Sequence, residues 1–563
     1  MTHAAVGEPG TQSLPLQAVT RNGQARQAAL RAYSGYTCAP TPGVAYCSSG
    51  RLLIVGPIDQ ALPLAQQAVQ AGITACHLVT LAGDKPDKAA RAAAGRYGIT
   101  FSCGEVFALT GYLGAFQYRV REQGDANGVS GTADLVLDLG PSPLFEQALP
   151  PFGYQAAGEV DADPQAALSM LTGLVGEFEK PQYFRYDASI CAHGRSGITA
   201  CTRCLDTCPT GAIQSLGEQI QVDPYLCQGA GSCATACPSG AITYRYPDLA
   251  DTLTRLRRLL ETYRESGGER PVVLFHDREN GVAQIRQQAA DLAENLLPVE
   301  VEEIGSVGLD SWLSALAFGA EQVGLLQPPG VVASVWHEVE LQLTVGRAMI
   351  AGMGYAPDLL RPLTEADLTV FGTEIPAGPA RDAGRYAGLD EKRSMLHLAI
   401  EHLYRFAPAP RPLVNLPQGA PFGEAWVDAE RCTLCMACVS QCPGRALQAG
   451  DELPRLTFIE ANCVQCGLCC RSCPEDAIAI SPRYLFDSGQ RRIARVLNEE
   501  QPFPCVVCGK PFATRSMIRH ISRQMGQHPM FQGAAARRLE MCEDCRVRDM
   551  MLAELPESEG NGP

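Results

Sequence analysis

The stretch that decides the fold runs from Cys432 to Pro474. It reads Cys432-Thr-Leu-Cys435-Met-Ala-Cys438-Val-Ser-Gln-Cys442-Pro443 and then, after about twenty residues, Cys463-Val-Gln-Cys466-Gly-Leu-Cys469-Cys470-Arg-Ser-Cys473-Pro474. Both segments follow the pattern Cys-x2-Cys-x2-Cys-x3-Cys-Pro. Thiols at such short, repeated spacings are typical of metal ligands, whereas the disulfides of secreted proteins belong to small, cysteine-dense domains. The stretch therefore predicts a metal-binding module.

This pair of runs resembles that of bacterial two-cluster ferredoxins, in which the fourth cysteine of each run serves the other cluster. A tight loop offers three thiolates to one [4Fe-4S] cluster, and the cysteine before proline begins a helix that leads to the second. The resemblance implies one cluster on Cys432, Cys435, Cys438 and Cys473, and another on Cys463, Cys466, Cys469 and Cys442. Zinc ligation and disulfides are the alternatives. Cys470 is surplus and is predicted to pack near its cluster.

Residues 181–246 repeat this theme in altered form. The first half has Cys191, a gap of nine residues, and Cys201-Thr-Arg-Cys204-Leu-Asp-Thr-Cys208-Pro209; the second reads Cys227-Gln-Gly-Ala230-Gly-Ser-Cys233-Ala-Thr-Ala-Cys237-Pro238. Ala230 stands where the second cysteine of the run belongs. Ferredoxin pairing implies one [4Fe-4S] cluster on Cys191, Cys201, Cys204 and Cys237. The other cluster would have only the thiolates of Cys208, Cys227 and Cys233.

The missing thiolate leaves two alternatives open. In ferredoxins that the module resembles, loss of the second cysteine is the usual route to a [3Fe-4S] cluster, or to a [4Fe-4S] cluster with one labile iron. The other alternative is a complete cluster whose fourth ligand is water, His193 or a cysteine of another domain.

The chain closes with two Cys-x2-Cys pairs, Cys505 with Cys508 and Cys542 with Cys545. Their spacing resembles a zinc-ribbon-like knuckle and predicts one structural zinc ion on four thiolates. A rubredoxin-type iron or a further cluster is the alternative, and His520 or His528 could replace a ligand. Five arginines around the histidines form either a partner-docking patch or a solvated helix face: Arg515, Arg519, Arg523, Arg537 and Arg538.

Elsewhere, alternating apolar strands and amphipathic helices predict two small α/β units. The expected fold class is thus α/β plus α+β multidomain. The expected boundaries are a mobile N-terminal arm (1–50), an α/β unit (51–180), the first ferredoxin module (181–246), a cysteine-free α/β unit (247–410), the second module (411–485) and the four-cysteine region (486–563). The turn after the first predicted strand, Gly56-Pro57-Ile58-Asp59, lacks the glycine pattern of a dinucleotide site. In the second α/β unit we expect a helix over 281–296.

Charge and hydrophobic pattern exclude some classes of binding partner and a membrane-spanning segment. A formal net charge of −15 argues against nucleic acid and anionic membrane surfaces as partners. No segment has about 18 uninterrupted apolar residues, and the N-terminus has no signal-peptide pattern, so we expect a cytoplasmic protein without a membrane span.

The order of domains resembles the long iron-sulfur proteins found beside formate dehydrogenase in proteobacteria. The sequence thus predicts an iron-sulfur electron-transfer protein or subunit that carries about four clusters and passes single electrons between a dehydrogenase and another carrier, and the resemblance implies formate dehydrogenase as that partner. Two alternatives stay open. One is an accessory or maturation factor of formate dehydrogenase, and the other is an oxidoreductase with its own flavin or substrate site.

Overall fold

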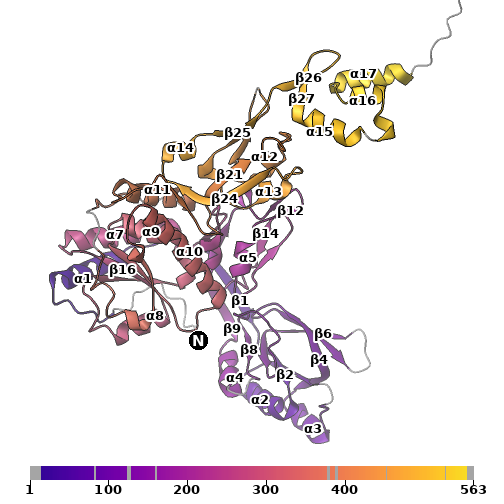
Figure 1. Ribbon diagram of the computed structural model, residues 1–563. Helices are drawn as coiled ribbons and strands as arrows, with labels where there is room; N and C mark the ends of the chain where they lie inside the picture. Colours follow the sequence, from indigo (N-terminus) through magenta and orange to yellow (C-terminus); the bar gives the residue numbers. More distant parts are fainter. Residues whose placement is uncertain are drawn as a thin grey trace, which may run out of the picture.

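The computed structural model describes residues 14–81, 84–122, 128–158, 162–376, 381–386, 391–451, 453–526 and 528–554. The molecule is a mixed α/β multidomain protein of elongated outline (Figure 1). Its N-terminal sheet lies at one end and its last three helices lie at the other. Within the described ranges, no helix combines the length and the apolar character that a membrane span requires.

The N-terminal unit is a seven-stranded sheet in the order β6-β5-β4-β3-β2-β7-β8. Strands β4, β3, β2, β7 and β8 are parallel, and β5 and β6 continue the sheet antiparallel. The N-terminus of α2 receives the Asp84 carboxylate, whose Oδ2 lies 2.7 Å from the backbone nitrogen of Ile58, so an internal acid holds the place a bound phosphate would take. The elements are β2 (Arg51–Gly56), α2 (Ile58–Gln70), β3 (Ala75–Thr80), α3 (Lys88–Arg96), β4 (Thr100–Thr110), β5 (Phe116–Glu122), β6 (Val129–Ala133), β7 (Leu135–Asp138), β8 (Tyr154–Ala156) and α4 (Pro164–Thr172).

Residues 14–50 differ from the mobile arm that their composition predicts. Helix α1 (Arg21–Ser34) buries Ala25, Ala29 and Tyr33 against α7 (Leu249–Glu265), more than 200 residues away in the sequence. Strand β1 (Gly43–Ser48) pairs with β9 (Gly176–Pro181). Small residues four apart make a narrow apolar stripe, which buries well only when a partner helix covers it. The first thirteen residues of the expected arm lie outside the described residues.

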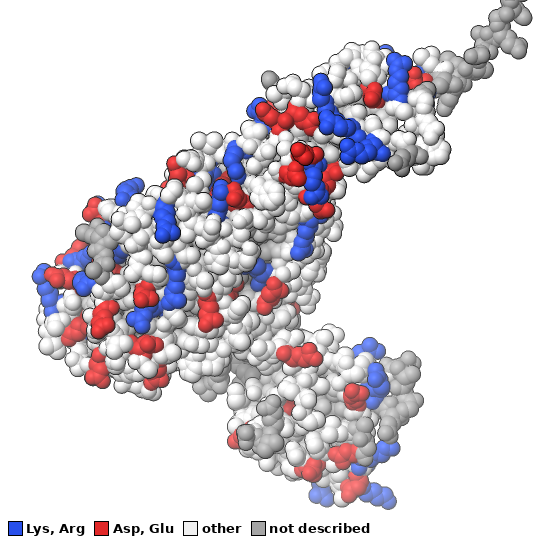
Figure 2. All heavy atoms as spheres, viewed as in Figure 1, with Lys and Arg blue, Asp and Glu red and all other residues white. Residues whose placement is uncertain are grey.

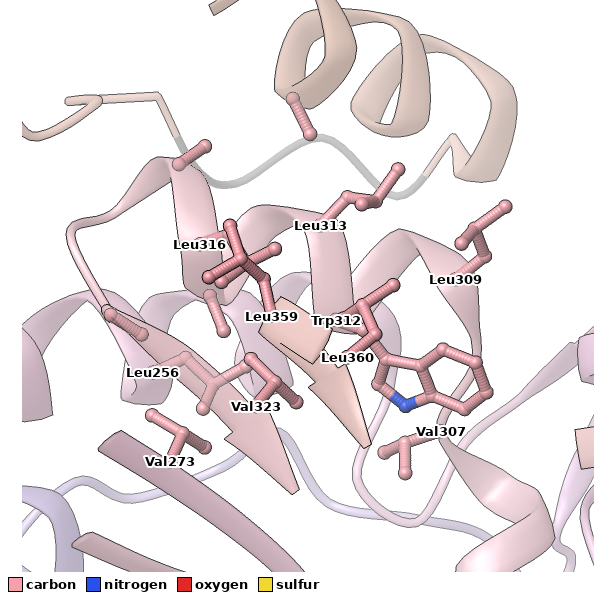
Figure 3. Packing of buried hydrophobic residues seen from close by; sticks show 14 of the residues in the cluster. Leu256, Val273, Val307, Leu309, Trp312, Leu313, Leu316, Val323, Leu359 and Leu360 are labelled. Carbon is pink, nitrogen blue, oxygen red and sulfur yellow. The ribbon is translucent and has the colours of Figure 1, made fainter. Parts of the chain in front are cut away.

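The central unit is a four-stranded parallel sheet in the order β17-β16-β18-β19, as the alternation of strands and helices predicts. Its core contains the fully buried Trp312 and surrounding leucine and valine side chains, including Leu256, Val307 and Leu360 (Figure 3). The elements are β16 (Val272–Asp277), α8 (Asn280–Gln287), β17 (Leu296–Val301), η2 (Ile304–Ser306), α9 (Leu309–Ala317), β18 (Gln322–Leu326), α10 (Ala333–Gly352), β19 (Leu360–Leu363) and α11 (Lys392–Arg405).

The helix expected over 281–296 is shorter than predicted. It ends at Gln287, and the next strand already begins at Leu296. Leu296, Leu297 and Val299 are buried because this strand pairs with β16 at the edge of the sheet. Pro298 is compatible with an edge strand, where one side of the backbone makes no ladder hydrogen bond.

The two ferredoxin-like regions consist of short strands and five-residue helices. The first contains β10 (Phe184–Tyr186), β12 (Ile198–Thr199), α5 (Arg203–Thr207), β13 (Ile213–Ser215), β14 (Ile220–Val222), α6 (Ser232–Ala236) and β15 (Ile242–Tyr244). The second contains β20 (Leu413–Asn415), β21 (Gly423–Val427), α12 (Ala437–Gln441), β22 (Leu447–Ala449), β23 (Arg455–Phe458), α13 (Leu468–Ser472), β24 (Ile478–Leu485) and β25 (Arg495–Glu499).

The C-terminal region is a hairpin followed by three helices. The hairpin strands are β26 (Pro502–Pro504) and β27 (Pro511–Thr514), and the helices are α15 (Arg515–Met525), α16 (Ala534–Arg538) and α17 (Glu543–Glu554).

Candidate iron-sulfur and metal centres

Three of the four cysteine runs share one loop conformation. In each, the residues two and four positions after the first cysteine have positive φ. These residues are Leu434 and Met436, Gln465 and Gly467, and Gly229 and Gly231. A non-glycine residue adopts this left-handed backbone at a steric cost of roughly 1–2 kcal/mol, so it persists only where the surrounding structure enforces it.

This loop turns backbone N–H groups toward the sulfur atoms. Burial raises the pKa of the Cys463 thiol. The backbone N–H of Gln465 donates a hydrogen bond to the sulfur of Cys463 and thereby reduces this rise in pKa. Cys227 has the same opposition between burial and the N–H of Gly229. Such donors stabilise a thiolate in a place where water cannot.

In the second module, two cavities each gather four thiols. One is lined by Cys432, Cys435, Cys438 and Cys473, together with the apolar side chains of Leu434 and Met436. The other is lined by Cys442, Cys463, Cys466 and Cys469, together with Val464 and Leu468. Each cavity therefore takes three cysteines from one run and the fourth from the other. Four thiols around an apolar cavity fit the donor set of a [4Fe-4S] cluster.

Cys470 does not line either of these two cavities. Its thiol contacts the thiol of Cys469, and this hydrogen bond together with burial raises the pKa of Cys469. Cys470 thus lies beside a candidate ligand and outside the cavity.

In the first module, the cysteines fall into two neighbouring groups. Burial raises the pKa of the Cys204 thiol, and the thiols of Cys237, Cys201 and Cys191 lie close enough to raise it further. Burial likewise raises the pKa of Cys233, and the thiols of Cys227 and Cys208 raise it further, with smaller effects from Cys204 and Cys237. Crowded buried thiols do not ionise without a compensating cation, which iron would supply.

Ala230 occupies the loop position of the absent cysteine. It lies between Gly229 and Gly231, whose φ values of 83° and 76° reproduce the conformation around Cys466 and Cys435. The loop also packs closely on η2, because a Cβ atom on Gly305 would lie 2.5 Å from the carbonyl oxygen of Ala230. The backbone therefore keeps the ligand loop although the methyl group of alanine cannot bind iron.

His193 is engaged elsewhere. Its Nδ1 lies 2.7 Å from the carbonyl oxygen of Cys201, and its Nε2 lies 2.7 Å from Ser215 Oγ. Both ring nitrogens therefore already have hydrogen-bond partners, so His193 in this orientation does not offer a fourth ligand to the site of Cys208, Cys227 and Cys233.

Three cations lie next to the cysteines, the buried Lys180 and the half-buried Lys392 and Arg393, and the sequence analysis missed all of them. The Nζ of Lys180 donates to the carbonyl oxygens of Tyr225 and Cys227. Burial lowers the pKa of Lys180 to about 8, against the opposite effect of Cys227. The Nζ of Lys392 donates to three carbonyl oxygens at the end of α6, including that of Cys237 at 3.2 Å.

Arg393 joins the two modules. One guanidinium nitrogen donates to the carbonyl oxygens of Pro238 and Pro421, and the other donates to those of Ala461 and Cys463 at 3.0 Å. Lys392 and Arg393 come from the start of α11, in a unit without cysteines. Helix α11 also contains Glu401 and Arg405, so a charged pair at its start is an ordinary pattern and did not mark these two residues in the sequence.

The modules also touch at their cysteine loops. The guanidinium of Arg471 donates to the carbonyl oxygen of Thr199, and β12 packs against α13. Burial raises the pKa of Cys466 to about 12, and Cys201 of the other module is among the thiols close enough to contribute. The four cysteine groups thus follow one another in space. The group of Cys208 is first, then that of Cys201, then that of Cys466, and finally that of Cys435.

A separate group at the C-terminal end has the spacing of a single-ion site. The Sγ atoms of Cys505, Cys508, Cys542 and Cys545 all lie within 4.8 Å of one another, and those of Cys508 and Cys542 are 3.7 Å apart. Four thiolates about 2.3 Å from one zinc ion are separated by about 3.8 Å, so the group fits that donor geometry. In the part of the chain that the structure describes, no other group of three or more His, Cys, Asp or Glu side chains is this close.

The backbone around this group also favours thiolates. Burial raises the pKa of Cys505, but hydrogen bonds from the N–H groups of Cys542, Cys508 and Val507 lower it to about 6. The loop turns at Gly509, where φ is 75°. Neither histidine belongs to the group, since His520 faces Glu475 and His528 accepts from the backbone nitrogen of Met530.

Comparison with known proteins agrees with the cysteine runs. Residues 198–241 match the 4Fe-4S dicluster domain, and residues 425–448 match a 4Fe-4S binding domain. The chain therefore contains two ferredoxin-type iron-sulfur domains. No curated protein matches the sequence.

Proposed function

We propose that this chain is an electron-transfer protein whose cysteines hold four iron-sulfur clusters in a line. Such clusters accept and release single electrons without making or breaking covalent bonds to a substrate. The observation that carries the proposal is the contact between the modules at their cysteine loops, where Arg471 donates to the carbonyl oxygen of Thr199 and β12 packs against α13.

The ligand sets of the proposal follow the two cavities and the thiol neighbourhoods. Cys432, Cys435, Cys438 and Cys473 hold one [4Fe-4S] cluster, and Cys442, Cys463, Cys466 and Cys469 hold the next. Cys191, Cys201, Cys204 and Cys237 hold the third. We propose a [3Fe-4S] cluster on Cys208, Cys227 and Cys233, supported by the retained loop around Ala230 and by the engagement of His193. The C-terminal thiols hold zinc.

The residues of the chain adjust these sites in two ways. Apolar side chains such as Leu434 and Leu468 exclude water, and solvent exposure is one determinant of cluster potential. Arg393 places a positive charge between the second and third cysteine groups, which favours the reduced, more negative state of both. We propose a dehydrogenase as electron donor, and formate dehydrogenase on the resemblance of domain order alone.

Anaerobic purification followed by iron, sulfide, zinc and flavin analysis and by EPR tests the proposal. We expect about fifteen irons and one zinc per chain, a three-iron signal after oxidation and stepwise reduction by dithionite. Protein without acid-labile sulfide would overturn the proposal. Bound flavin would favour the oxidoreductase alternative. Clusters that dithionite cannot reduce would favour an accessory role.

A further inference from the structure

The cysteine group of Cys435 lies at one end of the line, and helix α15 is fixed beside it. The hydroxyl of Thr514, which caps the helix, donates to the carbonyl oxygen of Thr433 at 2.8 Å. Farther along the helix, His520 lies 3.3 Å from the carboxylate of Glu475, a residue that lines the cavity of Cys435. The helix is therefore attached at two points to residues that line this cavity.

The outer face of α15 is basic. Arg515, Arg519 and Arg523 recur at intervals of four residues, so they lie along one face, and all three are exposed. None of them forms an ion pair with any residue that the structure describes. Figure 2 shows lysine and arginine side chains gathered over this helix. By contrast, Arg538 on α16 is paired with Asp549 at 2.6 Å and is not part of this face.

Cys435 itself is exposed, whereas the other cysteines of its group are only partly so. The second module therefore presents one candidate cluster to solvent beside a helix that carries three exposed, unpaired positive charges among the described residues. The whole chain carries a net charge of −15, so these charges are a local exception. A long-range field of this kind orients an oppositely charged protein as it approaches.

We propose that the face of Arg515, Arg519 and Arg523 is the docking surface for an acidic electron-carrier protein, and that it places this carrier over Cys435. The inference rests on the proposed electron-transfer function. An anionic membrane would also be attracted to arginines, but a protein carrier is favoured because the charges adjoin the exposed end of the cysteine line, and the rest of the chain would be repelled by such a membrane.

The test measures binding of a small, strongly acidic two-cluster ferredoxin to the full-length, cluster-loaded protein. The triple variant Arg515→Glu, Arg519→Glu and Arg523→Glu is compared with Lys88→Glu, Arg91→Glu and Arg96→Glu on α3, at the opposite end of the molecule (Figure 1). The two variants undergo the same change in net charge, so general repulsion affects them equally. A neutral variant with three glutamines on α15 separates loss of attraction from new repulsion.

We expect the α15 variant to bind the ferredoxin roughly tenfold more weakly at low salt, the glutamine variant to lie between it and the wild type, and the α3 variant to match the wild type closely. The wild-type affinity should fall as salt is added. Equal affinities of the α15 and α3 variants would overturn the proposal, as would binding to phosphatidylglycerol vesicles that depends on α15 while ferredoxin binding does not.

Reduction by dithionite separates this inference from the function on which it rests. Dithionite is small and needs no docking surface, so all variants should be reduced to the same extent. If the wild type is not reduced, the electron-transfer proposal fails. If it is reduced and the α15 charges leave ferredoxin binding unchanged, only the docking surface fails.

Discussion

The two ferredoxin-like modules contain the same ligand loop in different surroundings. In the second module, the backbone N–H groups of Ala446 and Ala477 donate directly to the sulfurs of Cys442 and Cys473, at 3.2 and 3.3 Å. In the first module, the equivalent N–H groups of Ala212 and Ala241 instead donate to the hydroxyls of Thr210 and Ser239. These hydroxyls in turn lie 3.4 and 3.6 Å from Cys208 and Cys237.

The surroundings differ as well. Helix α10 of the central unit packs against α5 and α6 of the first module, while the second module exposes Cys435 beside the C-terminal region. The comparison shows that the loop conformation survives the loss of a ligand at Ala230, because packing on η2 supports the loop independently of the missing thiolate. The fold of the module and the chemistry of its site are thus separable.

The largest expected effect, the loss of a whole cluster, comes from removing a cysteine that one run supplies to the cluster of the other run. Cys473→Ala should remove the cluster of Cys432, Cys435 and Cys438, and because metal binding contributes to folding it should also lower the melting temperature of the second module. Iron and sulfide analysis would show a loss of about four irons per chain. Cys470→Ala is the matched control and should retain the iron. Loss of iron from the control variant alone would show that Cys470, not Cys473, is a ligand.

Ala230→Cys should give both modules two complete sets of four cysteine ligands. With the loop conformation already present, the new thiolate completes a four-cysteine set, and the three-iron EPR signal of the oxidised protein should disappear as about one iron is gained. Ala230→Ser controls for the added volume and should keep the signal. A wild-type protein that shows no three-iron signal under any oxidation condition would contradict this prediction.

Arg393→Met tests the connection between the modules. Removing this half-buried positive charge disfavours the reduced state, so the potentials of the clusters at Cys201 and Cys466 should fall by roughly 60 mV, equivalent to about 1.4 kcal/mol for one electron. EPR-monitored redox titration measures this shift, and Arg393→Lys should restore part of it. The control is Arg491→Met, which removes a buried arginine whose hydrogen-bond partners are Leu485, Phe486 and Glu401. An equal shift in both variants would argue against a local effect.

The smallest effect is expected at the far end of the first module. The Nζ of Lys180 donates to the carbonyl oxygens of Tyr225 and Cys227, and among the described residues it has no hydrogen bond to a cysteine of another group. Lys180→Met should therefore lower the potential of the cluster at Cys208, Cys227 and Cys233 alone, by a few tens of mV. The same titration would show whether the other three potentials stay unchanged, and a shift common to all four would indicate a general structural change.

The sequence determined the cysteine runs and the module that each run defines. Thiolate spacing is a local property, and the αL-prone glycines at Gly229, Gly231 and Gly467 mark the loop directly. It also determined the central parallel sheet, since strands and helices alternate there. The helix expected over 281–296 was too long, because only pairing with β16 decides that Leu296 begins a strand.

The tertiary structure alone decided what lies between the sites. The packing of α1 on α7, the passage of Arg393 from one module to the other and the seating of α15 on the loop of Cys435 all join residues far apart in the chain. Such contacts depend on the shape of both partners, so neither segment signals them by itself. The sequence specified the thiol ligands, and folding decided which cysteine groups lie next to one another.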